Sequence, residues 1–91
     1  MAKQLEVESD EWNKEFSSGR WSCLDENPAE RARHAVIGMY CRKYFPSGNI
    51  LDVGCGVGTL VDFLSDKQKK KYIGIDISSA AINIGRKKER V

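Results

Sequence analysis

The sequence predicts an α/β fold in which two short parallel strands are flanked by helices and preceded by an amino-terminal helical segment. Three observations support this class. Residues 49–53 form an apolar, β-branched run that ends in a glycine-rich turn, after which the apolar residues change to helical spacing. Residues 71–76 form a second strand-like run, followed by two serines that can cap another helix. Residues 27–30, Asn-Pro-Ala-Glu, are typical of a helix start.

The amino-terminal helix is expected over residues 6–17. Val7, Trp12 and Phe16 are its only sizeable apolar side chains, so its apolar stripe is thin. Residues 17–19, Ser-Ser-Gly, end it. Trp12 is therefore better explained by packing in a core or a lid than by a substrate cage.

The second helix is expected to begin at Pro28, with Asn27 as its N-cap and Glu30 reaching back to the cap. Residues 46–48, Pro-Ser-Gly, stop it. At helical spacing this helix should bury one apolar face, made of Ala32, Ala35, Val36, Met39, Tyr40 and Phe45.

The glycine-rich turn carries the most specific pattern in the chain, Asp-x-Gly-x-Gly-x-Gly over residues 52–58. The dinucleotide fingerprint Gly-x-Gly-x-x-Gly fails in both registers, because Thr59 and Val61 stand where its third glycine belongs. No Lys-Ser or Lys-Thr follows the glycines, which excludes a P-loop. Asp52 would repel an anionic diphosphate, whereas it would attract a ligand that carries an ammonium group.

A second acid stands at the end of the second strand. Asp76 follows Gly58 by 18 residues, a distance that suits hydrogen bonds to a ribose diol. Ser78 and Ser79 then begin the next helix. The pair of strands therefore predicts a ligand site at their carboxyl ends, beside a helix N-terminus.

Together these elements resemble the cofactor-binding half of the class I S-adenosylmethionine-dependent methyltransferases, over about residues 28–88. The resemblance implies a partial Rossmann-like half-domain. Residues 1–27 would be an amino-terminal helix and loop, and residues 28–91 the first half of an S-adenosylmethionine-binding domain. A complete domain of this family has a seven-stranded sheet, whereas only two strands are expected here, so the sheet needs completion.

The resemblance also implies a site for S-adenosylmethionine or S-adenosylhomocysteine. Asp52 would hold the methionine ammonium group or the loop amides; otherwise it caps the turn. Asp76 would bind the ribose, or else cap the following helix. Ile77 would lie against the adenine or belong to the core. Arg31 or Arg33 would reach the methionine carboxylate from the preceding helix, or lie on a solvated helix face. The expected cofactor-binding residues are Asp52, Gly54, Cys55, Gly56, Gly58, Asp76, Ile77 and Arg31.

No catalytic residue can be named from the sequence. The sulfonium of the cofactor is already activated, so such an enzyme mainly aligns the methyl acceptor and excludes water. Cys55 is better explained as a small side chain between glycines than as a nucleophile, and His34 is a weak candidate for a base. Three cysteines without a Cys-x-x-Cys pair and a single histidine argue against a metal site.

The composition indicates a cytoplasmic protein. No apolar run approaches the roughly 18 residues of a membrane span, no signal-peptide core is present, and the odd cysteine count favours reduced thiols. Residues 1–30 hold eight acids and three bases, whereas residues 31–91 hold five acids and twelve bases. The basic clusters at 67–71 and 86–90 are explained by a polar loop and a helix end, so nucleic-acid binding is not favoured.

Three functions remain open. The chain is a methyltransferase-family protein that acts only when another chain or self-association completes it, a truncated non-catalytic binding or interaction module, or a basic nucleic-acid-associated protein. The isolated chain is not expected to be catalytically competent. Two strands leave open edges and apolar faces, which predicts a homo-oligomer. The residues on these apolar faces are Ile50, Leu51, Val53, Ile73 and Ile75.

Overall fold

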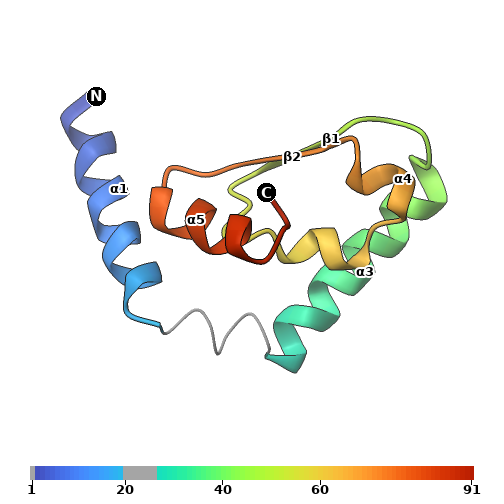
Figure 1. The fold of residues 1–91 in the computed structure, drawn as a ribbon, viewed down its shortest axis with the longest axis horizontal. Coiled ribbons are helices and arrows are strands. Elements are labelled where there is room, and N and C mark those ends of the chain that lie inside the picture. Colours follow the sequence, from blue (N-terminus) through green and yellow to red (C-terminus); the bar gives the residue numbers. More distant parts are fainter. Residues whose placement is uncertain (1, 20–26) are drawn as a thin grey trace.

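The computed structural model describes residues 2–19 and 27–91. Its class is the predicted one: two parallel strands with flanking helices, preceded by an amino-terminal helix (Figure 1). The loop expected between the first two helices falls on residues 20–26, outside the described part. The elements are α1 (Ala2–Ser17), α3 (Pro28–Tyr44), β1 (Ile50–Val53), the 3₁₀ helix η1 (Thr59–Phe63), α4 (Asp66–Lys69), β2 (Tyr72–Ile75) and α5 (Ser79–Lys87).

The two strands pair in parallel, with Ile50 opposite Tyr72 and Val53 opposite Ile75. Both strands lie within the predicted ranges. Because side chains alternate along a strand, the sheet has two distinct faces. One face is partly covered by the rest of the molecule. The other exposes Leu51 by 62%, Val53 by 71%, Ile73 by 61% and Ile75 by 45%.

The connection from β1 to β2 is helical but short. The residues after the glycine turn form the 3₁₀ helix η1, and α4 adds four more helical residues. The break between them has a local cause, since Ser65 and Gln68 form a reciprocal capping box that starts a new helix. The buried Gln68 amide also donates to the Cys41 and Phe45 carbonyls at 3.0 and 3.2 Å. The connection is thereby fixed to the end of α3.

Helix α3 begins where predicted but packs differently, and the Glu30 side chain pairs with Arg33 rather than with the cap. The Asn27 side chain accepts hydrogen bonds from the amides of Ala29 and Glu30, and Pro28 is the first helical residue. The prediction of a buried apolar face was wrong, because its large members are about half exposed or more. The buried position is Gly38, where an added Cβ would lie 2.6 Å from Phe63 Cβ. The helix thus approaches η1 through its smallest residue, and its larger apolar side chains, Val36, Met39, Tyr40 and Phe45, stay exposed.

One buried cluster lies between α1, the glycine loop and α5, and Leu60, Val61 and Leu64 in and just after η1 are buried as well. Phe16 of α1 is buried with Val57 and Ala81, and Ala80 and Ile84 pack against this cluster. Figure 1 shows α1 beside α5 at one end of the molecule, and α3 with α4 at the other. Among residues 2–19 and 27–91, no helix combines the length and apolarity needed to cross a membrane.

Candidate functional site

The glycine loop leaves β1 and folds back onto the end of β2. The amides of Gly54 and Cys55 both donate to the Ile75 carbonyl, at 2.8 and 3.0 Å. Gly54 has a φ of 72°, a left-handed conformation that costs glycine little and other residues more. A Cβ added there would meet no atom within 4 Å. Backbone, rather than side chain, therefore faces the open space beside this turn.

Asp76 joins this loop to the start of α5. Its Oδ2 accepts a hydrogen bond from the Gly56 amide at 2.9 Å, and its Oδ1 accepts one from the Ser78 amide at 2.9 Å. Each carboxylate oxygen has a further lone pair that can accept another donor. Ser78 in turn caps α5, because its hydroxyl accepts from the Ala81 amide at 3.2 Å. The prediction that Ser78 begins the last helix is confirmed.

A cavity of about 680 Å³ opens at the carboxyl ends of the two strands. This volume lies within the range of small-molecule sites, about 300–1,000 Å³. The glycine loop and the ends of both strands form one side, and α1 and α3 form the other. The lining residues are Trp12, Phe16, Glu30, Arg33, His34, Val53, Gly54, Cys55, Gly56, Val57, Thr59, Ile75, Asp76 and Ile77.

The cavity brings together five of the eight residues predicted from the sequence: Gly54, Cys55, Gly56, Asp76 and Ile77. The other three lie outside its lining. They are Asp52, Gly58 and Arg31.

Asp52 points to the covered face of the sheet. Its Oδ2 accepts a hydrogen bond of 2.8 Å from the Tyr72 hydroxyl. Burial, and then the hydrogen bond and negative charge of Asp52, raise the pKa of Tyr72 far above its ordinary value. The Tyr72 hydroxyl therefore stays protonated near neutral pH and donates to Asp52. This hydrogen bond joins the two strands, so Asp52 has a structural role that does not depend on a ligand.

Gly58 is required by close packing with the carboxyl-terminal residues. A Cβ there would lie 3.0 Å from Arg90 Cβ and 3.0 Å from Val91 Cγ2, which is tighter than ordinary van der Waals contact. Its φ of 77° belongs to the same left-handed region as that of Gly54. Gly58 therefore lets the loop pack closely against Arg90 and Val91.

Arg31 is part of a charged network rather than of the cavity wall. Its Nη1 lies 3.3 Å from Asp62 Oδ2, and its guanidinium lies 4.9 Å from the centre of the Phe63 ring. Arg90 contacts the same carboxylate at 2.6 Å. Burial raises the pKa of Asp62, but the hydrogen bonds and charges of Arg90 and then Arg31 outweigh it and hold that pKa below its ordinary value. The network joins α3, η1 and the end of the chain.

Cys55 lines the cavity as a thiol. Burial, and then the charges of Asp52 and Asp76, raise the pKa of Cys55 to about 11. Since the thiolate is the nucleophile, this cysteine is inert near neutral pH. Its sulfur also fills the space beside Gly74, where an added Cβ would lie 2.8 Å from Sγ.

The α3 side of the cavity is polar. Arg33 Nη2 lies 2.5 Å from Glu30 Oε2, and His34 Nδ1 lies 2.9 Å from the Glu30 carbonyl. A carbonyl only accepts, so Nδ1 carries the proton and Nε2 is the basic nitrogen when the ring is neutral. Of the two arginines considered from the sequence, Arg33 rather than Arg31 lines the cavity.

The α1 side of the cavity is aromatic. Trp12 and Phe16 lie with their ring centres 6.1 Å apart. The sequence indicated packing for Trp12, but it carried no signal that Phe16 reaches the glycine loop. Among residues 2–19 and 27–91, no group of three or more His, Cys, Asp or Glu side chains is arranged to hold a metal ion.

Comparison with known proteins finds similarity to methyltransferases. Residues 50–91 match a family model described as a methyltransferase domain. The ribosomal RNA small subunit methyltransferase C of Yersinia pseudotuberculosis is 28% identical over 91 residues, covering 92% of this chain and 26% of the relative. The protein of the same name from Yersinia pestis (strain Pestoides F) gives the same figures. The chain thus spans about a quarter of the length of these relatives. No solved structure matched.

These matches confirm the resemblance to the class I S-adenosylmethionine-dependent methyltransferases, at the amino-terminal, cofactor-binding half of such a domain. The paired parallel strands and flanking helices fit a partial Rossmann-like half-domain.

Proposed function

We propose that the chain binds S-adenosylmethionine and its product S-adenosylhomocysteine in the cavity at the carboxyl ends of β1 and β2. The main support is the link between the glycine loop and Asp76, which places an acid with free lone pairs beside exposed backbone. The methyltransferase-domain match begins at the first residue of β1 and includes this whole arrangement. In this proposal residues 28–91 form the first half of the binding domain, and residues 1–27 precede it.

The cavity has suitable groups for each part of the cofactor. Asp76 can accept hydrogen bonds from the ribose hydroxyls. Ile75 and Ile77, both about half exposed, offer an apolar surface for the adenine. Gly54 and Gly56 let the ligand approach the backbone, and Arg33 offers a positive charge for the methionine carboxylate. Asp52 and Gly58 would support the loop from outside the cavity, and Arg31 would hold α3 in place.

The cofactor supplies an activated methyl group, so the protein has to bind, orient and exclude water. In this proposal the described residues bind the cofactor, and the aromatic side chains of α1 exclude part of the water. The methyl acceptor would be held by parts that complete the sheet. We therefore propose that methyl transfer requires another chain or a second copy, and that alone the chain is a binding module.

Binding of S-adenosylhomocysteine, measured by calorimetry, tests this proposal. We expect Asp76→Ala to weaken binding by about 1–3 kcal/mol, the usual result of leaving hydrogen bonds unmade. Asp66→Ala is the matched control, because the Asp66 side chain is fully exposed on α4. Circular dichroism checks that both variants fold.

The 2′-deoxy analogue of S-adenosylhomocysteine separates ribose contact from a general effect on the loop. It should bind the wild type more weakly than the natural ligand does, and the difference should shrink in Asp76→Ala. Undiminished affinity in a folded Asp76→Ala protein would remove this residue from the site. No binding by the wild type at millimolar ligand would contradict the proposed function.

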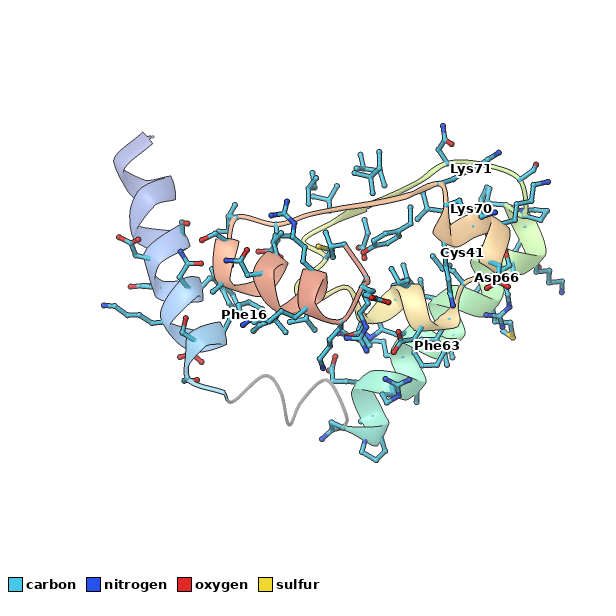
Figure 2. All side chains as sticks on the ribbon, in the orientation of Figure 1. Phe16, Cys41, Phe63, Asp66, Lys70 and Lys71 are labelled. Carbon is cyan, nitrogen blue, oxygen red and sulfur yellow. The ribbon has the colours of Figure 1, made fainter. Side chains whose placement is uncertain are left out.

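A second candidate function is nucleic-acid binding. It is favoured by one feature of the structure that was not evident in the sequence. Exposed cations at the α3–α4 end of the molecule lie with exposed aromatic rings, a combination that binds single-stranded nucleic acid. Tyr40 and Tyr44 are stacked, with ring centres 5.8 Å apart, and Lys43 Nζ lies 5.2 Å from the Tyr44 ring. Figure 2 shows Lys70 and Lys71 at this end. The exposed cations at this end are Arg42, Lys43, Lys67, Lys69, Lys70 and Lys71.

Titration of a fluorescent single-stranded RNA at two salt concentrations tests this candidate. Binding should weaken as salt rises, because each phosphate contact releases counterions. The double variant Lys67→Gln/Lys70→Gln should weaken binding further. Lys87→Gln/Lys88→Gln is the control, since it removes the same charge near the end of α5. Equal losses in both double variants, or no binding at low salt, would exclude an RNA surface at α3–α4.

A further inference from the structure

Asn13 connects α1 to the start of α5. Its Oδ1 accepts hydrogen bonds from the Ser78 hydroxyl at 2.8 Å and the Ala80 amide at 3.0 Å, with the Ser79 hydroxyl at 3.4 Å. These three donors converge on a single oxygen atom. One helical turn earlier, Ser9 donates from its hydroxyl to the Ile77 carbonyl at 2.8 Å.

The position of Asn13 follows from the needs of a helix start. The first amides of a helix have no partner inside the helix, and they carry partial positive charge. Ser78 satisfies the Ala81 amide from within the same segment. The Ala80 amide is satisfied by Asn13, which is 67 residues away in the sequence. α5 is thus capped partly by another helix.

The segment held by Asn13 is also the segment that positions Asp76. The Ser78 amide donates to Asp76 Oδ1, and the Ser78 hydroxyl donates to Asn13. One turn after Asn13, Phe16 reaches the glycine loop, and a Cβ on Gly56 would lie 3.7 Å from its ring. Figure 2 shows Phe16 directed from α1 toward α5. α1 therefore contacts the segments on both sides of the Asp76–Gly56 hydrogen bond.

We propose that Asn13 is a positioning residue for the ligand cavity. It holds α1 on residues 77–80, and this contact keeps the aromatic rings of Trp12 and Phe16 in the cavity wall. Because the same contact orders the Asp76 segment, docking of α1 and binding of a ligand favour each other. The identity of the ligand rests on the proposed function; the docking of α1 does not.

Two substitutions at Asn13 separate its hydrogen-bonding role from its shape. Asn13→Ala removes the acceptor, whereas Asn13→Asp keeps it and places a negative charge at the start of α5, where such a charge is favourable. Asn83→Ala is the matched control, because Asn83 is exposed on α5. The first readout is amide hydrogen exchange over residues 9–17 without ligand. The second is the affinity for S-adenosylhomocysteine.

We expect Asn13→Ala to speed exchange in α1 and to weaken S-adenosylhomocysteine binding about 2- to 30-fold, the range for a lost helix cap. Asn13→Asp and Asn83→Ala should resemble the wild type in both readouts. In the wild type and in Asn13→Asp, the ligand should slow exchange in α1.

Three results would overturn the inference: unchanged affinity in Asn13→Ala, equal losses in the Ala and Asp variants, or exchange in α1 that does not respond to the ligand. Failure of the wild type to bind S-adenosylhomocysteine would overturn the proposed function and the coupling. In that case amide exchange in α1, compared between the wild type and the Asn13 variants without ligand, still shows whether Asn13 holds α1 on residues 77–80.

Discussion

At the scale of single residues, the chemistry of the loop depends on small side chains and on one carboxylate. Gly54 leaves backbone open to the cavity, and Gly58 permits the close approach of Arg90 and Val91. Asp76 then accepts a hydrogen bond from the Gly56 amide, and this contact within the protein helps to fix the shape of the loop.

The pKa of Cys55 gives a prediction at this scale. In a Cys23→Ser/Cys41→Ser background, alkylation of Cys55 should rise with pH toward about pH 11. At pH 8 the thiolate fraction should be about 100-fold below that of a cysteine with the ordinary pKa of 9.0. The pKa of Cys55 is higher in the folded protein than in the unfolded chain. Its contribution to the free energy of unfolding is therefore fully present below pH 9 and is lost as the pH rises through about 11. An inflection at or below pH 9 would contradict the burial and charge described for this thiol.

The residues of the site that could be predicted are those carried by contiguous motifs. Gly54, Gly56 and Asp76 follow directly after strands, and parallel strands bring their carboxyl ends to one edge of the sheet. Arg31 could not be assigned in the same way. Its partner, Asp62, is 31 residues away, and the rotation of α3 decides which arginine meets the cavity. That rotation depends on packing against η1, which no local pattern encodes.

At the scale of elements, α3 shows why the apolar pattern gave the wrong buried face. The hydrophobic spacing of α3 predicts which side chains share a face, but not which face its neighbour contacts. Contact at Gly38 allows the helix backbone to lie close to Phe63, and the Arg42 side chain donates to the Phe63 carbonyl on the same side. The starts of α3 and α5 were predictable, because the caps Asn27 and Ser78 act within a few residues. The start of α1 was not, since this helix begins at Ala2 and the sequence predicted residue 6.

Gly38→Ala tests this packing. Alanine favours a helix interior by about 1 kcal/mol over glycine, so a solvent-exposed site would gain stability. Here the new Cβ would lie 2.6 Å from both Cβ and the carbonyl oxygen of Phe63. We expect overpacking to outweigh propensity and to cost about 1–3 kcal/mol, measured as a lower midpoint in urea.

Gly48→Ala is the control for this measurement. A Cβ at Gly48 would meet no atom within 4 Å, and its φ lies outside the left-handed region. We expect no loss of stability there. A stabilised Gly38→Ala protein would mean that α3 does not contact η1 through Gly38.

At the scale of the whole molecule, the main feature is an uncovered sheet. Parallel sheets are normally covered on both faces, yet one face here exposes Leu51, Val53, Ile73 and Ile75. Ile50, which the sequence placed among the bare apolar residues, is only partly exposed. This exposed apolar face supports the proposal that a second copy or another chain covers it.

Self-association should therefore depend on the exposed face. We expect the wild type to sediment as a dimer or larger species at micromolar concentration, and Leu51→Lys/Ile73→Lys to shift it toward monomer, because a buried interface does not accept unpaired charges. Lys69→Glu, at an exposed position on α4, is the control. A wild type that sediments as a folded monomer would contradict a second copy as the cover.

The central claim, that the glycine loop and Asp76 form a binding site for S-adenosylmethionine, is tested most directly by amide chemical shifts during titration with S-adenosylhomocysteine. The account predicts that the shift changes concentrate in residues 53–59 and 75–80, with smaller changes in α1 around Phe16. Residues 66–71, at the opposite end of the strands, should not respond. Changes confined to that opposite end, or none at millimolar ligand, would contradict the claim.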